Sequence, residues 1–190
     1  MTSVSIKSSA DLGSQRRHST GFTMIELLVT MVVLAVIMSL AAPSLTNLVR
    51  DQRVKTVVGD IYAAMAFARS EAIKRNVYVG VCSHNGSSGC QNSTDWGTYG
   101  WIVYLDADGN GYPGAVSDIH KKQDPIADIT LTGTGSNVSY QGDGRLRALP
   151  APFVASIAGN DTITVRCVRL DLGGRPNIQV DTNKAVAGCQ

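Results

Sequence analysis

The chain has 190 residues, of which 44% are hydrophobic and 17% charged, so it is long enough to bury a core of its own. Its 17 basic and 15 acidic residues nearly balance, which excludes a polycationic nucleic-acid binder and a disordered acidic tail. The charges are unevenly spread, and the unusual part is the N-terminal one.

A long apolar segment occupies residues 22–45. Between Arg17 and Arg50 there is no lysine or arginine, and the single acidic residue is Glu26. At about 1.5 Å per residue, a helix over this segment is about 36 Å long, enough to cross a hydrocarbon core of about 30 Å. Basic residues within residues 1–21 predict that the N-terminus stays in the cytoplasm and that the rest of the chain faces outward.

A cleaved secretory signal peptide is the alternative for this segment, because Ala41-Ala42-Pro43 follows the apolar run. The run is long for a signal peptide, and Glu26 lies near its start. A carboxylate inside a membrane-spanning helix is costly and requires a partner, so Glu26 is a candidate functional residue.

The sequence Gly21-Phe22-Thr23-Met24-Ile25-Glu26-Leu27-Leu28-Val29 resembles the processing signature of type IV pilins and type II secretion pseudopilins. The resemblance implies that a prepilin peptidase removes residues 1–21 and that Phe22 becomes the N-methylated N-terminus. It implies that Glu26 pairs with the N-terminal amine of a neighbouring subunit and that Pro43 is a helix-breaking proline. The chain without its leader carries 14 residues of each sign.

The next segment, residues 46–76, has the pattern of an amphipathic helix. Apolar residues recur at spacings of three and four, which predicts one buried stripe. The stripe consists of Val54, Val57, Val58, Ile61, Met65, Ala68, Ala72 and Ile73.

Residues 77–190 have the pattern of a β domain. Short apolar segments alternate with clusters of Gly, Asp, Asn and Pro, and the expected strands are Val77–Cys82, Tyr99–Leu105, Ile129–Thr132, Val138–Tyr140, Phe153–Ile157, Thr162–Leu170 and Asn177–Val180. No βαβ alternation is present, so the fold class is α+β, with a long N-terminal helix packed on a mainly antiparallel β domain. Residues 66–72, the strand into Cys82, and Trp101 with its acidic hairpin resemble the GspH/FimT/FimU branch of minor pilins and pseudopilins.

Four cysteines, Cys82, Cys90, Cys167 and Cys189, lie in the part expected outside the cytoplasm. An even number in an oxidising compartment predicts disulfides. We expect Cys82–Cys90 and Cys167–Cys189, because each pair closes a local loop. A zinc site with His84 and His120 is the alternative, but it lacks close Cys-x-x-Cys pairs.

The segment Asp106-Ala107-Asp108-Gly109-Asn110-Gly111 copies the start of an EF-hand loop. Asp106, Asp108 and Asn110 are therefore calcium candidates. The twelfth loop position is Ser117 instead of glutamate, which favours a turn between two strands.

The sequence contains no Gly-x-Ser-x-Gly element and no phosphate-binding glycine loop, and we expect neither enzymatic activity nor a cofactor. Gly144-Arg145-Leu146-Arg147 resembles an element that contributes to DNA capture in FimT-type minor pilins. Arginine suits phosphate because its planar group donates two parallel hydrogen bonds. The candidate DNA contacts are Arg145, Arg147, Arg166, Arg169 and Arg175; solvated arginines or contacts between subunits are the alternative.

Together these features predict a minor pilin that is a structural subunit of a type IV pilus, at or near the tip, and promotes pilus assembly. The alternatives are a DNA receptor at the pilus tip and a minor pseudopilin of type II secretion. The expected partners are other minor and major pilins, the prepilin peptidase and the inner-membrane assembly platform. The expected location is the bacterial inner membrane, crossed once with the C-terminal domain in the periplasm, and then the filament.

Overall fold

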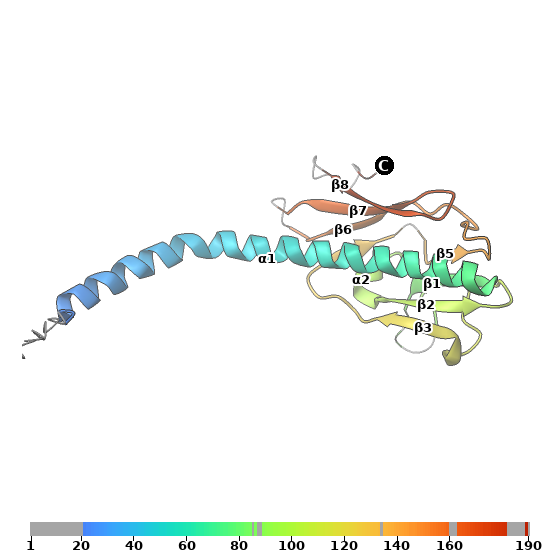
Figure 1. Cartoon of the computed structure of the whole chain (residues 1–190), viewed down its shortest axis with the longest axis horizontal. Coiled ribbons are helices and arrows are strands. Elements are labelled where there is room, and N and C mark those ends of the chain that lie inside the picture. The colour runs from blue at the N-terminus through green and yellow to red at the C-terminus, as the bar shows by residue number, and fades with distance from the viewer. Residues whose placement is uncertain are drawn as a thin grey trace, which may run out of the picture. The chain divides into compact units, whose positions relative to one another are not determined.

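The structure is a computed structural model that describes residues 21–84, 86, 89–133, 135–159, 163–181 and 189. The expected leader lies outside the described residues except for Gly21. The chain forms two compact units, the first ending at Ala42 and the second beginning at Pro43. Helix α1, Met24–Arg75, contributes to both (Figure 1).

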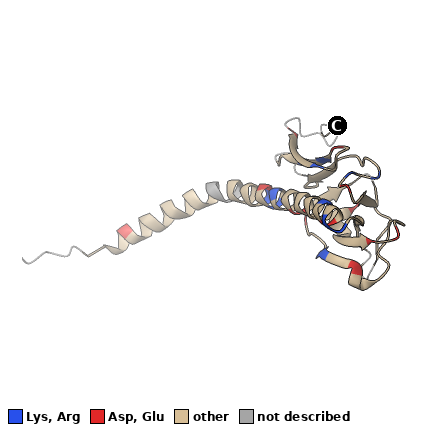
Figure 2. Cartoon of the chain, turned by 45° about the vertical axis from the view of Figure 1, so that its right-hand side comes forward, with Lys and Arg blue, Asp and Glu red and all other residues tan. Residues whose placement is uncertain are grey.

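The part of α1 in the first unit is apolar all round. Every described side chain from Met24 to Ser39 is exposed within the chain, and charge is almost absent from this part (Figure 2). Among the described residues, no single straight helix is long and apolar enough to cross a membrane. Met24–Ser39 and Ser44–Arg75, taken together as a bent pair, satisfy that test by length and composition.

The part of α1 in the second unit is amphipathic, as its spacing predicts. The expected stripe is buried except at Ile73, whose side chain is 49% exposed. The helix ends at Arg75 because Asn76 adopts a left-handed conformation with φ 53°, a common way to end a helix. In the last turn, a hydrogen bond from Arg75 to Glu71 lowers the pKa of the Glu71 carboxyl.

The first sheet has the strand order β3-β2-β1-β5 and is antiparallel throughout. Its strands are β1 (Tyr78–Ser83), β2 (Trp101–Asp106), β3 (Ile119–Gln123) and β5 (Asn137–Tyr140). In the central strand, Val81 pairs with Val103 on one side and Val138 on the other. A short helix α2 (Trp96–Tyr99) precedes β2, and a 3-10 turn η1 (Val116–Asp118) precedes β3.

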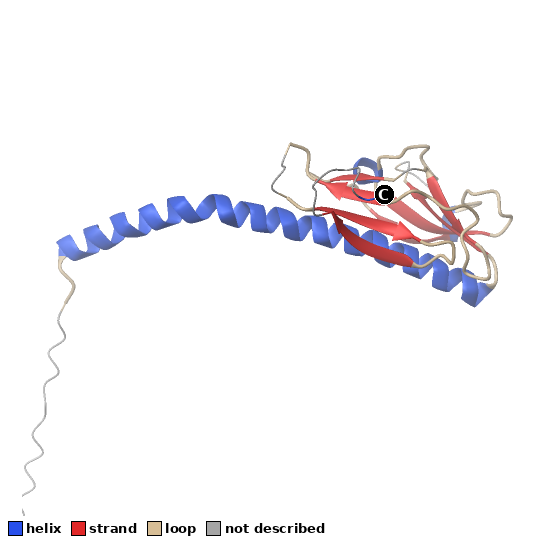
Figure 3. Cartoon of the chain, turned by 90° about the horizontal axis from the view of Figure 1, so that it is seen from above, coloured by secondary structure: helices blue, strands red, loops and turns tan. Residues whose placement is uncertain are grey.

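The second sheet has the order β4-β6-β7-β8 and is also antiparallel. Its strands are β4 (Thr130–Thr132), β6 (Phe153–Ser156), β7 (Val165–Leu170) and β8 (Pro176–Asp181). Figure 3 shows the strands of the second unit together with α1. The α+β class and the antiparallel arrangement agree with the prediction.

One hydrophobic core joins α1 to both sheets. It contains Ile61 and Met65 from α1, Val103 from the first sheet and Val168 from the second. Trp96 of α2 lies edge-on to Phe153, with ring centroids 4.8 Å apart. Its indole nitrogen donates to the Gly135 carbonyl at 3.0 Å, so this buried aromatic residue has its polar atom satisfied.

Candidate assembly site

The Gly21–Phe22 bond lies just before the start of α1. Residues 21–23 are not helical and are exposed, and the Phe22 side chain is 80% exposed. Apart from its chain neighbours, no described residue has an atom within 4 Å of the position that a side chain on Gly21 would occupy. A bond in an open, irregular segment is accessible to a peptidase, whereas a bond inside the helix is not.

Thr23 and Glu26 form a capping box at the start of α1. The Glu26 amide donates to Thr23 Oγ1 at 3.2 Å, and the Thr23 amide donates to Glu26 Oε2 at 3.5 Å. This reciprocal pattern satisfies amides that have no partner within the helix. The role of Thr23 was not predicted from the sequence, although a threonine three residues before a glutamate and ahead of an apolar run is the recognised signal of a capping box.

Apolar side chains are exposed on all sides of the first part of α1, Met24–Ser39. The exposed fractions are 93% for Met24 and between 51% and 67% for most of the others. The set is Met24, Ile25, Leu27, Leu28, Val29, Met31, Val32, Val33, Leu34, Val36, Ile37 and Met38. A contiguous apolar surface of this extent requires a cover of lipid or of other apolar helices.

The structure contains a disulfide between Cys82, at the end of β1, and Cys90, with a Cα–Cα distance of 5.6 Å. The Cα atoms of Cys167 in β7 and Cys189 lie 6.0 Å apart, a distance that a disulfide can span, and this second pairing stays a prediction. Among the described residues, no group of three or more His, Cys, Asp or Glu side chains could hold a metal ion.

Two of the five candidate arginines lie on two similar turns. In the turn 141–145, the Gly144 amide donates to the Gln141 carbonyl, and in the turn 171–175, the Gly174 amide donates to the Asp171 carbonyl. Both glycines have positive φ, 78° and 76°, and an exposed arginine, Arg145 or Arg175, follows each one.

The two turns are in contact. A side chain on Gly174 would collide with the Gly144 carbonyl oxygen. The same oxygen accepts a hydrogen bond from Arg69 Nε of α1 at 3.1 Å. The contact of Arg69 with these turns was not predicted from the sequence, because it depends on tertiary packing.

The other three arginines have different environments. Arg166 is partly buried and lies 3.7 Å from an Asp51 oxygen, and Arg147 donates to the Gly109 carbonyl at 2.6 Å. Arg169 is exposed on β7 and lines a shallow pocket with Arg175. Of the five predicted arginines, only Arg166 has an acidic partner within 4.0 Å among the described residues.

The calcium candidates lie in the hairpin that joins β2 to β3. Asp106 ends β2 and is buried, whereas Asp108 and Asn110 are exposed. Burial raises the pKa of the Asp106 carboxyl, and the adjacent Asp108 raises it further, against the hydrogen bond from the Gly111 amide.

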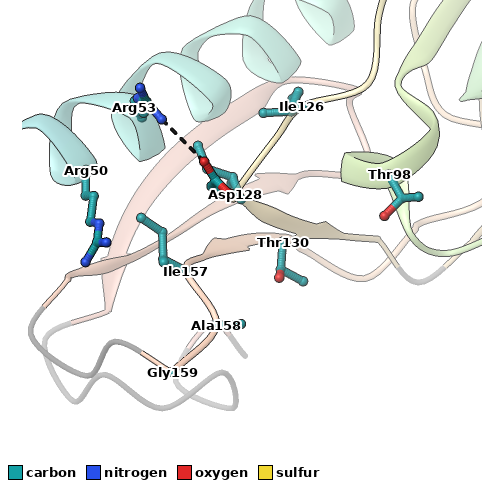
Figure 4. A pocket seen from close by; sticks show the side chains of 10 residues that line it. Arg50, Arg53, Thr98, Ile126, Asp128, Thr130, Ile157, Ala158 and Gly159 are labelled. Atoms are coloured by element: carbon teal, nitrogen blue, oxygen red, sulfur yellow. Dashed lines mark ion pairs between the residues drawn. The ribbon is translucent and has the colours of Figure 1, made fainter.

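A surface pocket of about 630 Å³ lies between α1 and the strands of the second sheet (Figure 4). Arg50, Arg53 and Asp128 line it, with Thr98, Thr130 and Ile157. Arg53 and Asp128 form an exposed ion pair at 3.6 Å, which is worth little to stability. A second, more apolar groove of about 620 Å³ shares Arg53 and is lined by Leu48, Val49 and Ile126.

A long N-terminal helix that opens with a capped, apolar segment and ends against antiparallel sheets is the fold of a pilin. The family model described as type II transport protein GspH matches residues 57–181, so the chain belongs to the GspH family. The prokaryotic N-terminal methylation motif matches residues 16–42. The family predicted from the sequence is therefore confirmed.

Solved structures support the same fold. The chain is similar to the type IV minor pilin FimU of Pseudomonas aeruginosa strain PAO1 in two crystal forms. The first has a TM-score of 0.52 and 16% identity over 70% of this chain and 92% of FimU. The second has a TM-score of 0.50 and 16% identity over 69% and 94%. No curated protein matches the chain.

Proposed function

We propose that the protein is a minor pilin of a type IV pilus, located at or near the tip, where it promotes pilus assembly. The observation that supports this most strongly is the start of α1. An exposed Gly21–Phe22 bond, a glutamate in the helix-capping box and an apolar helix that is exposed on all sides follow one another there.

In this proposal, the chain crosses the inner membrane once, through residues 22–45. The prepilin peptidase cuts after Gly21, which creates a cationic amine on Phe22 in place of a neutral peptide bond. The β domain, residues 77–190, faces the periplasm until the assembly platform moves the subunit into a filament with major and other minor pilins.

Glu26 would align subunits through its charge. Among the described residues of the single chain, Glu26 Oε2 accepts only a long hydrogen bond of 3.5 Å from its own Thr23 amide. A charged group among apolar helices is costly unless an opposite charge pairs with it. The N-terminal ammonium of a neighbouring subunit is such a charge, so the subunit is held best at the depth where the two groups meet.

Matched variants separate this charge from the capping role. Glu26→Gln keeps an oxygen that caps the helix but cannot neutralise an amine, whereas Glu26→Ala loses both. We expect both variants to remain in the membrane and to enter sheared filaments poorly. Thr23→Ala, which weakens the cap alone by about 1 kcal/mol, is the control and should enter them well. Normal incorporation of Glu26→Gln would refute the role of the charge.

A minor pseudopilin of type II secretion is the alternative within the same family, because both machines use this processing signal. Deletion of the gene, scored for twitching, secretion and transformation, distinguishes them. Loss of twitching with normal secretion supports the pilus, and the reverse result supports the pseudopilus.

A second candidate function is DNA binding at the pilus tip. The observation that favours it is the group Arg69, Arg145, Arg169 and Arg175, which has no acidic partner within 4.0 Å among the described residues. Neutralising about four phosphates would give a salt slope of about −3.6 on duplex DNA, which supports weak binding without sequence preference.

The test of DNA binding is a gel shift with the mature chain in detergent. Arg145→Gln with Arg175→Gln should weaken the shift and reduce the salt slope by about 1.8. Lys121→Gln with Lys122→Gln removes the same charge from β3 and should change little. No shift with the unmodified protein at low salt would exclude this candidate.

A further inference from the structure

The β2–β3 hairpin contains a buried carboxylate, Asp106, that has one oxygen without a hydrogen-bond partner among the described residues. Asp106 is only 1% exposed, and its Oδ2 accepts the Gly111 amide at 3.0 Å. Its Oδ1 is buried and accepts no hydrogen bond from any described residue. A buried anionic oxygen without a donor is costly, so an unobserved partner is the expected explanation.

The residues around Asp106 disfavour its charged form, because they include a second carboxyl group and, among those described, no cationic partner. The neighbouring Asp108 carboxyl raises the pKa of the Asp106 carboxyl further, so a second acidic group acts on the same carboxyl. Within the described part of the chain, no lysine or arginine comes within 4.0 Å of either carboxylate. The nearby Arg147 binds the Gly109 carbonyl instead.

The rest of the loop is built to hold these carboxylates in place. Gly109 and Gly111 have positive φ, 69° and 89°, which lets the chain fold back over Asp106. The Gly111 carbonyl accepts from Tyr104 Oη and from Asn137 Nδ2, which anchors the far end of the loop to the sheet. Asn110 Nδ2 donates to Asp108 Oδ2 at 2.7 Å, and Asn110 Oδ1 accepts the Tyr112 amide at 2.8 Å on the exposed side of the loop.

We propose that this hairpin binds a calcium ion through Asp106 and Asp108, with Asn110 and water completing the shell. Calcium takes six to eight oxygen ligands in flexible geometry, so it tolerates a site with only two carboxylates. Such a sparse site should have a dissociation constant on the order of 10⁻⁴ to 10⁻³ M, the range of extracellular modules. The export in the proposed function would make that affinity useful, but binding itself does not depend on it.

Terbium luminescence tests this proposal with the mature chain in detergent. Terbium replaces calcium in oxygen sites and emits when a nearby tyrosine is excited, and Tyr112 lies two residues from Asn110. We expect saturable emission that calcium displaces at millimolar concentration. Calcium at ten times its dissociation constant should also raise the melting temperature by about 3 to 6 °C over EDTA.

Two variants with the same charge change make the test specific. Asp108 is exposed, so Asp108→Asn should fold normally but bind terbium and calcium at least about tenfold more weakly. Asp118→Asn is the control, because Asp118 lies in the same hairpin and accepts the Ala115 amide at 2.7 Å; it should bind like the unmodified protein.

Three results would overturn the proposal. They are absent terbium emission, an equal effect of magnesium at the same concentration, and unchanged binding by Asp108→Asn. Absent emission would mean that the hairpin holds no ion. An equal effect of magnesium would mean that the site does not select calcium, and unchanged binding by Asp108→Asn would mean that the ion binds elsewhere.

Discussion

At the scale of single residues, Glu26 belongs to a capping box within the chain, and we propose a different role for it between chains. The Thr23–Glu26 capping box sets the first residue of α1. The same carboxylate is the only acidic group in a long apolar segment. Sequence could identify Glu26 through its cost in a membrane, and it contained the signal for Thr23 as well. It could not identify Arg69, whose contact with Gly144 joins residues 75 positions apart.

Gly174 provides a prediction at this scale. Its φ is 76°, and a side chain there would collide with the Gly144 carbonyl oxygen and lie 2.9 Å from the Tyr140 ring. Gly174→Ala should therefore lower the free energy of unfolding by about 1 to 2 kcal/mol for the backbone and by about 1 to 3 kcal/mol more for crowding.

Gly159→Ala is the matched control. Gly159 has a similar φ of 70°, but no described residue other than its chain neighbours comes within 4 Å of the new side chain, so the variant should lose only the backbone contribution. Denaturant unfolding measures both variants. Equal losses would contradict the close contact between the two turns.

At the scale of secondary-structure elements, α1 is one helix with two different surfaces. Its first part exposes apolar side chains on all sides, and its second part buries one stripe in the core. The hydrophobic pattern predicted both parts, because the change from uniform to periodic apolar residues is visible in the sequence.

The β elements were harder to predict where polar residues form strands. Strand β3, Ile-His-Lys-Lys-Gln, is an edge strand with three exposed central residues, so it lacks an alternating pattern. Lysines on such an edge also discourage pairing with other chains. Tyr99 was expected in a strand but ends α2, which begins because the Asp95 side chain accepts the Thr98 amide at 3.0 Å.

A pair of isoleucine variants tests the division of α1. Ile61 is fully buried, whereas Ile25 is 67% exposed. Ile61→Ala should lower the free energy of unfolding by about 2 to 5 kcal/mol. Ile25→Ala should leave it within about 0.5 kcal/mol and should reduce incorporation into filaments instead. Unfolding in detergent and filament shearing measure the two effects, and a strong loss of stability in Ile25→Ala would contradict the assignment.

At the scale of the whole molecule, the two compact units suit two tasks. The unit that begins at Pro43 contains the core, both sheets and the Cys82–Cys90 disulfide. The unit that ends at Ala42 has an apolar helix with no core of its own among the described residues. A subunit that waits in a membrane and then packs into a filament needs both, because lipid and neighbouring apolar helices can cover the same surface in turn.

The measurement that tests the central claim most directly is mass spectrometry of the N-terminus of the protein in membrane and sheared-filament fractions. We expect a mature chain that begins at N-methylated Phe22 in both fractions, with residues 1–21 absent. A chain that begins after Ala42, as a cleaved signal peptide would leave it, would have lost Glu26 and the apolar helix, and would contradict the claim.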